Sequence, residues 1–160
     1  MGQPLFQIRD LVRRYDVIVK SSNYALYGDI SRRVMTLIAN EAPDSAIYSI
    51  DEIFVDLDNM PIDHDRWALD LKVKILRETG IPVGIGISST KTLAKLANRL
   101  AKKSSKAQGV VVLDDQKWID VALNRTEAAD VWGVGRKSAL KLATFGVTTA
   151  LQLRDMPDPA

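Results

Sequence analysis

Two adjacent carboxylates, Asp51 and Glu52, interrupt the strand-like run YSIDEIFVDL at residues 48–57. Burying an unpaired carboxylate is costly or shifts its protonation. A chain that places two acids in such a run therefore offers them to a positive partner, and a divalent cation is the first candidate. The alternative is a surface β-turn with two solvated acids, and the pair alone does not exclude it.

A basic segment follows this acidic site along the chain. Residues 83–113 carry six Lys or Arg and no Asp or Glu. Projection of residues 89–106 on a helix separates an apolar face from a basic face. A solvated face usually mixes both signs of charge, whereas cations without acids repel each other unless phosphate is nearby. The pattern therefore favours phosphate or nucleic-acid contact over an ordinary solvated face. The basic face comprises Lys91, Lys95, Arg99, Lys102, Lys103 and Lys106.

A third candidate site lies at residues 131–139, Val-Trp-Gly-Val-Gly-Arg-Lys-Ser-Ala, between two short helical patterns. The spacing resembles the helix-hairpin-helix motif, in which Gly133 and Gly135 permit a tight turn. Backbone N–H groups at the start of the second helix would point at a DNA phosphate, and Arg136 and Lys137 add charge there. The alternative is a simple corner between two helices, because Gly-x-Gly is common in turns.

Periodicity predicts the elements that must position these residues. The first two thirds of the chain mixes strands and helices, and the part after Asp114 is helical only, so we predict an α+β fold with a boundary near residue 114. Strands are predicted at 16–20, 46–50, 53–57, 83–87 and 110–113. Helices are predicted at 5–14, 24–40, 63–79, 89–103, 116–123, 126–131, 136–144 and 148–154.

The composition excludes several other classes of site. There is no cysteine and only one histidine, His64, so disulfides, Cys-ligated zinc and His-based catalysis are excluded or disfavoured. Residues 84–92 lack the glycine spacing of a Walker A loop, and residues 56–65 lack the glycine and glutamate of an EF-hand. No run reaches the roughly 20 apolar residues of a membrane span, and no signal peptide is recognisable, so we expect a cytoplasmic protein.

Four segments together resemble the Y-family translesion DNA polymerases, and the resemblance covers essentially the whole chain. They are YSIDEIFVDL (48–57), VGIGISSTKTLAKLANRLAKK (83–103), GVVVL (109–113) and DVWGVGRKSALKLATFGV (130–147), in that order. The Trp132-Gly133 step stands where the DinB branch typically has Pro-Gly, so the chain is more similar to the UmuC branch, of ImpB-MucB-SamB type. The opening segment, residues 1–35, also resembles that branch.

The resemblance implies a polymerase palm, with an antiparallel or mixed sheet packed by helices in a ferredoxin-like arrangement, followed by a small all-α thumb with a helix-hairpin-helix. It implies fingers at residues 1–22, palm at 23–113 and part of the thumb at 114–160. Asp51 would bind both catalytic Mg²⁺ ions and Glu52 one of them, for two-metal transfer of a nucleotide to a primer 3′-hydroxyl. Lys102 would bind the triphosphate of the incoming dNTP.

The same resemblance implies primer-template DNA as a partner, held by Gly133, Gly135, Arg136 and Lys137, while the basic face adds Lys95 and Arg99. A UmuD-like accessory subunit, RecA and the sliding clamp are further implied partners. The family's first metal-binding Asp and its strand are missing from this segment, so we expect an inactive fragment whose exposed sheet edge favours dimerisation or a strand rearrangement. The alternatives are a non-catalytic DNA-binding module and a nucleotidyl-cyclase-like palm, although the latter would carry Gly-Gly beside the acids.

Overall fold

Four short strands form two separate two-stranded sheets in the computed structural model, which describes residues 2–157. Strand β1 (Asp44–Ile47) pairs antiparallel with β2 (Ile53–Asp56), with Ile47 opposite Ile53. Strand β3 (Ile85–Ser88) pairs parallel with β4 (Val110–Leu113). The predicted α+β class is confirmed, but the expectation of one mixed sheet is wrong, because no ladder joins β2 to β3 within residues 2–157.

Two helices form a common layer beneath both sheets. Helix α2 (Tyr24–Ala39) begins at Asn23, whose side chain accepts a hydrogen bond from the Leu26 N–H, and α3 (His64–Thr79) begins at Asp63 in the same way. Their apolar stripes meet at Val34, Ile38, Leu71 and Ile75, and residues of both β2 and β3 pack on this cluster. The two sheets are therefore aligned by the helices and not by hydrogen bonds to each other. The strand residues in this cluster are Ile53 and Val55 of β2 and Ile85 of β3.

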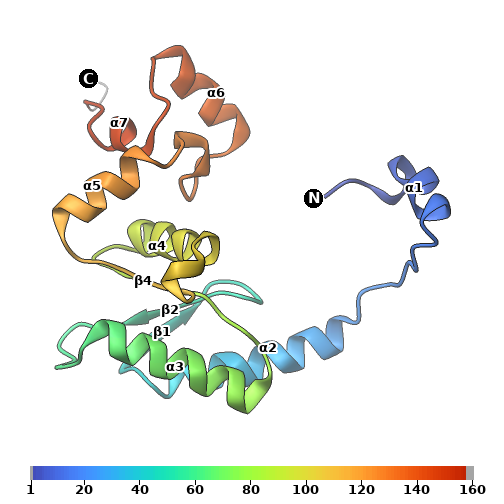
Figure 1. Cartoon of the computed structure of the whole chain (residues 1–160), viewed down its shortest axis with the longest axis horizontal. Helices are drawn as coiled ribbons and strands as arrows, with labels where there is room; N and C mark the ends of the chain where they lie inside the picture. The colour runs from blue at the N-terminus through green and yellow to red at the C-terminus, as the bar shows by residue number, and fades with distance from the viewer. Residues whose placement is uncertain (1, 158–160) are drawn as a thin grey trace.

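Helix α4 (Lys91–Lys103) covers the opposite face of the β3–β4 sheet, so that the sheet lies between α3 and α4 (Figure 1). Its predicted apolar face is confirmed, because Leu96, Ala97 and Ala101 are buried. The close packing requires a glycine in β3. A Cβ on Gly86 would lie 2.1 Å from the Asn98 nitrogen and 2.4 Å from the Ala94 oxygen.

The chain after β4 is helical and rests on α4. Its elements are α5 (Gln116–Asn124), the 3₁₀ turn η3 (Ala128–Asp130), α6 (Arg136–Thr144) and α7 (Ala150–Arg154). A further 3₁₀ turn, η2 (Ser105–Ala107), lies between α4 and β4. Residues 126–131, predicted as a helix, form only this 3₁₀ turn with flanking residues. Leu96, Leu113, Ile119, Leu123 and Ala150 share one core, so α4, β4, α5 and α7 pack as a unit.

The N-terminal segment stands apart from the rest of the molecule (Figure 1). Its elements are η1 (Leu5–Gln7) and α1 (Arg9–Arg14), close to the helix predicted at 5–14. The strand predicted at 16–20 is wrong, because these residues pair with no strand and Ile18 is 79% exposed. A β-branched run needs a partner strand to become a ladder, and the segment has none in the described part of the chain. Within residues 2–157 no helix combines the length and apolar character of a membrane span.

Candidate functional site: an acid pair and a basic pocket that share Glu52

The acid pair lies in the connection between β1 and β2. The N–H groups of Tyr48 and Ser49 both donate to the Glu52 carbonyl oxygen, at 3.0 and 3.1 Å, and so close the hairpin just beyond the last strand pair. Strand β1 therefore ends at Ile47, three residues before the predicted end of the strand. The turn exposes Asp51 and leaves Glu52 half-buried. The sequence prediction that two strand-like runs meet at the acid pair is confirmed.

Hydrogen bonds hold the Asp51 end of this turn. The Ser49 hydroxyl donates to the Asp51 carboxylate at 2.7 Å, and the Asp51 N–H donates to the Ser49 hydroxyl oxygen at 3.3 Å. The Ser31 hydroxyl of α2 donates to the Ile50 carbonyl oxygen at 2.5 Å, which ties the turn to the helical layer. The Asp51 carboxylate is thus oriented by the protein but remains open to solvent, as a cation ligand must be.

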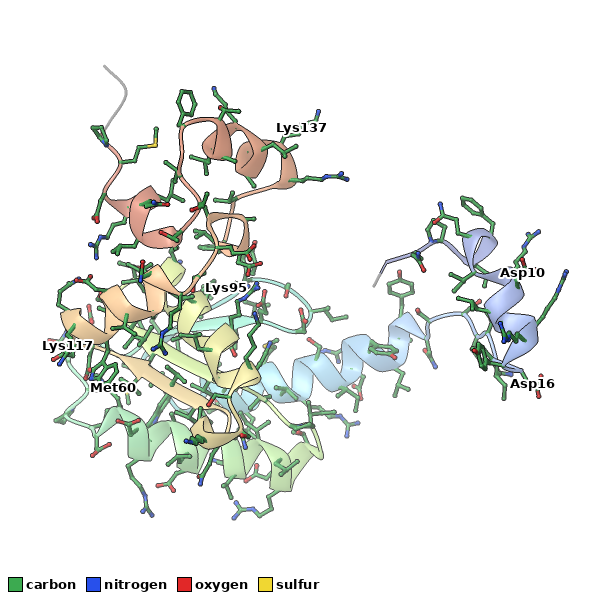
Figure 2. All side chains as sticks on the ribbon, turned by 45° about the horizontal axis from the view of Figure 1, so that its top comes forward. Asp10, Asp16, Met60, Lys95, Lys117 and Lys137 are labelled. Carbon is green, nitrogen blue, oxygen red and sulfur yellow. The ribbon has the colours of Figure 1, made fainter. Side chains whose placement is uncertain are left out.

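Glu52 differs from Asp51 because it has a cationic partner. Its carboxylate forms an ion pair with Lys95 of α4, and the two side chains are only 26% and 21% exposed. The Lys95 ammonium also lies over the rings of Tyr48 and Trp132, 5.4 and 5.8 Å from their centroids. In Figure 2, Lys95 lies between α4 and the C-terminal helices. Residues far apart in the sequence thus converge on one ammonium group.

Three aromatic rings form a bridge from the β-hairpin to the C-terminal helices. The centroids of Tyr48 and Trp132 are 5.3 Å apart, and Phe54 lies within 5.8 Å of both. The Trp132 indole N–H donates to the Tyr48 hydroxyl oxygen at 3.2 Å. The Lys91 ammonium lies 5.3 Å from the Phe54 centroid. Sequence reasoning used Trp132 only as a mark of the UmuC branch and missed this contact, because nothing local signals a pairing across 84 positions.

A second ion pair lies one helical turn further along α4. Arg99 pairs with Asp130 of η3, and both side chains are about one third exposed. The basic face of α4 is therefore compensated at Lys95 and Arg99 by acids from other elements, which corrects the premise that all its cations are unpaired. No ion pair involves Lys102 or Lys103 in the described part of the chain, and both are exposed.

These side chains surround a pocket of about 520 Å³. Four of its lining residues are cationic and two are acidic, so its net charge is positive. Asn98 also lines the pocket, but its side-chain oxygen is buried without a hydrogen-bond partner among residues 2–157. The lining residues are Glu52, Lys95, Asn98, Arg99, Lys102, Lys103, Asp130 and Trp132.

The glycine turn before α6 does not join this pocket, although Trp132 does. Gly133 has φ +90°, a left-handed conformation that favours glycine, whereas Gly135 has φ −80° and precedes α6 in an ordinary extended conformation. Arg136 and Lys137 are exposed in the first turn of α6. Figure 2 shows Lys137 at the outer rim of the molecule, away from Lys95. The predicted DNA-contacting residues therefore form two separate surfaces.

The donor set suits a cation that is shared with a phosphate ligand. No group of three or more His, Cys, Asp or Glu side chains occurs within residues 2–157 at metal-binding distances. Mg²⁺, however, is usually held by one or two carboxylates together with substrate phosphates and water. Asp51 and Glu52 can supply the carboxylates, and the adjoining cationic pocket can hold the phosphates.

Comparison with known proteins places this arrangement in a family. A family model described as "impB/mucB/samB family" matches residues 1–99. The chain is 42% identical over 157 residues to Protein UmuC of Salmonella typhimurium (strain LT2) and 38% identical over 155 residues to Protein MucB of Escherichia coli. Each alignment covers 96% of this chain and 37% of the relative, so the chain spans little more than a third of the length of these relatives.

A solved structure shares the fold. The insertion ternary complex of Dbh DNA polymerase superposes with a TM-score of 0.77 at 25% identity, over 96% of this chain and 43% of that one. The arrangement of α2, α3, α4 and the two sheets is thus that of the matched part of a DNA polymerase.

Proposed function

Because this chain belongs to the impB/mucB/samB family, we propose that it supplies the palm and part of the thumb of an error-prone translesion DNA polymerase of the UmuC branch. The enzyme would act in DNA repair and SOS damage tolerance, and it would extend primer-template DNA with dNTPs. The observation that carries the proposal is that the Glu52 carboxylate lines the cationic pocket of α4 and that the solvent-exposed Asp51 is its neighbour in the same turn. Nucleotidyl transfer needs both groups, one for metal and one for phosphate.

Within this proposal each residue has a definite task. Asp51, oriented by Ser49, and Glu52 would hold Mg²⁺, which would supply electrostatic stabilisation for phosphoryl transfer. Lys102, exposed on the pocket lining, binds the triphosphate of the incoming nucleotide. Lys95 and Arg99 also line the pocket, and each would contact phosphate only when its ion pair with an acid opens.

The domain assignment is part of the proposal. Residues 1–22 would belong to the fingers, 23–113 to the palm and 114–160 to the thumb. The turn at Gly133 and Gly135, with Arg136 and Lys137 at the start of α6, would hold duplex phosphates as a helix-hairpin-helix does. The unpaired edges of β2 and β3 in residues 2–157 support pairing with a further strand, such as one from a second copy. The UmuD-like subunit, RecA and the clamp stay predictions from the family resemblance.

Primer extension tests the proposal. In the polymerase that contains this chain, Asp51→Ala should abolish Mg²⁺-dependent incorporation and leave DNA binding largely intact, because the carboxylate contacts metal and not DNA. Asp58→Ala is the matched control, since Asp58 is an exposed acid beyond the other end of β2. Near-normal turnover of Asp51→Ala would contradict the assignment. The 160-residue chain alone should show no incorporation, because its described residues contain no cluster of three acids.

A non-catalytic DNA-binding module is the second candidate. It is favoured by the exposed cations Lys102, Lys103, Arg136 and Lys137, which do not depend on a metal. This reading predicts salt-sensitive duplex binding by the isolated chain. Binding that does not weaken as salt rises from 50 to 200 mM would count against both candidates.

A further inference from the structure

The Lys95 ammonium is the cationic partner of the Glu52 carboxylate. It forms an ion pair with that carboxylate and is further stabilised by the faces of Tyr48 and Trp132. Both side chains of the pair are about three quarters buried, so water replaces neither partner easily. The pocket therefore carries its own counter-ion at the point where a carboxylate would meet an external cation.

This contact occupies two potential binding groups at once. The Glu52 carboxylate is partly neutralised by Lys95 and is a poorer ligand for a divalent cation. The Lys95 ammonium is equally unavailable to a phosphate, although it lines the same pocket as Lys102 and Lys103. Either ligand alone must break the pair and leave one half-buried charge without its partner, which is costly. Both ligands together break the pair once and compensate both charges.

We infer that the Lys95–Glu52 pair is an exchangeable internal counter-ion that makes cation binding at Glu52 and oligophosphate binding at Lys95 positively coupled. The coupling is reciprocal, because each ligand removes the competitor of the other. Lys95 acts here as a positioning residue that controls access to Glu52. The inference rests on the proposed function only in that the acid pair meets a divalent cation and the pocket meets phosphate.

The first experiment measures inorganic tripolyphosphate binding by calorimetry in EDTA, so that no metal–phosphate complex forms. Glu52→Gln frees Lys95 and should tighten binding about fivefold relative to the unsubstituted chain. Asp51→Asn is the matched control, because it removes a neighbouring acid that forms no ion pair within residues 2–157, and it should change binding less than twofold. Equal gains in both variants would show a general field effect and overturn the inference, as would no gain in Glu52→Gln.

The reciprocal experiment measures Mg²⁺ binding without phosphate. Lys95→Met removes the ammonium group but keeps a side chain of similar length, so it frees Glu52 and should tighten Mg²⁺ binding about fivefold. Lys103→Met removes a cation from the same pocket lining but from no ion pair in the described residues, and it should change binding less than twofold. If Lys95→Met and Lys103→Met changed the Mg²⁺ affinity equally, the inferred exchange of the Lys95–Glu52 pair for external ligands would be contradicted.

The Trp132 indole N–H signal reports the exchange directly, because Lys95 lies over its ring. In the unsubstituted chain, which has three tryptophans, Mg²⁺ should move this NMR signal towards its position in metal-free Glu52→Gln. If neither Mg²⁺ nor the Glu52→Gln substitution shifts this signal, the inference is overturned even if the binding affinities change. The assays contain no DNA, so their failure is separate from a failure of primer extension, which tests the polymerase proposal.

Discussion

The two basic surfaces of this protein, on α4 and at the start of α6, look alike in sequence but differ in their surroundings. On α4, Lys95 and Arg99 have acidic partners from the β-hairpin and from η3, and the helix packs tightly on the β3–β4 sheet. On α6, Arg136 and Lys137 are exposed, no ion pair to them occurs in the described residues, and the helix has no buried residue. The charges of Lys95 and Arg99 are thus compensated and held in place, whereas those of Arg136 and Lys137 are freely solvated.

The largest expected effect concerns how closely α4 approaches the sheet. Gly86→Ser places a Cβ about 2 Å from α4 backbone atoms, so the helix must shift at a cost of about 3 kcal/mol of unfolding free energy. Gly135→Ser before α6 is the matched control, because a Cβ there meets nothing within 4 Å and serine is a good helix cap. Urea denaturation of both variants measures the difference. Similar stability of the two would contradict the tight packing.

A smaller effect is expected where the two regions meet. Trp132→Ala removes two ring contacts and the hydrogen bond to Tyr48, and we expect a loss of about 2 kcal/mol in unfolding free energy. Trp118→Ala is the control, because Trp118 is 60% exposed on α5. It should cost about 0.5 kcal/mol or less. Equal losses in thermal unfolding would mean that the aromatic bridge does not dock the C-terminal helices.

Duplex DNA binding distinguishes the solvated cations from the paired ones. Lys137→Gln should reduce the slope of log affinity against log salt by about 0.9, the value for one lost phosphate contact. Arg99→Gln should reduce it less, because Arg99 is held by Asp130. Titrations at several salt concentrations give both slopes. A larger change for Arg99→Gln would reverse the comparison and place the main DNA contact on α4.

The smallest effect concerns pH and lies within the C-terminal helices. The Arg154 guanidinium and the Gln116 amide donate to the Asp120 carboxylate and hold its pKa below the ordinary value of about 3.9. Because the folded pKa is lowered, this contribution is present above pH 4 and is lost as pH falls through the folded pKa. Asp120→Asn should make the melting temperature less dependent on pH below about pH 4. Asp58→Asn controls for the loss of one acid.

Helices were the most predictable part of the fold, since their signals are local. Helices α2 and α3 lie close to the predicted ranges 24–40 and 63–79, and the apolar face of α4 is buried as its periodicity indicates. The strand at 16–20 failed because a β-branched run forms a strand only against a partner. The prediction of a single sheet was wrong for a similar reason. Whether β2 pairs with β3 depends on how the two strands are placed in the tertiary structure and not on their own residues.

The sequence by itself determined the acid pair at a strand junction, the two basic segments and the family, because these depend on residue types in fixed order. Only the tertiary structure decided that Glu52 meets Lys95, that Arg99 meets Asp130 and that Trp132 reaches Tyr48. The physical reason is that a charge is free or compensated according to its neighbours in space. Here the neighbours come from the β-hairpin, α4 and η3, which are far apart along the chain.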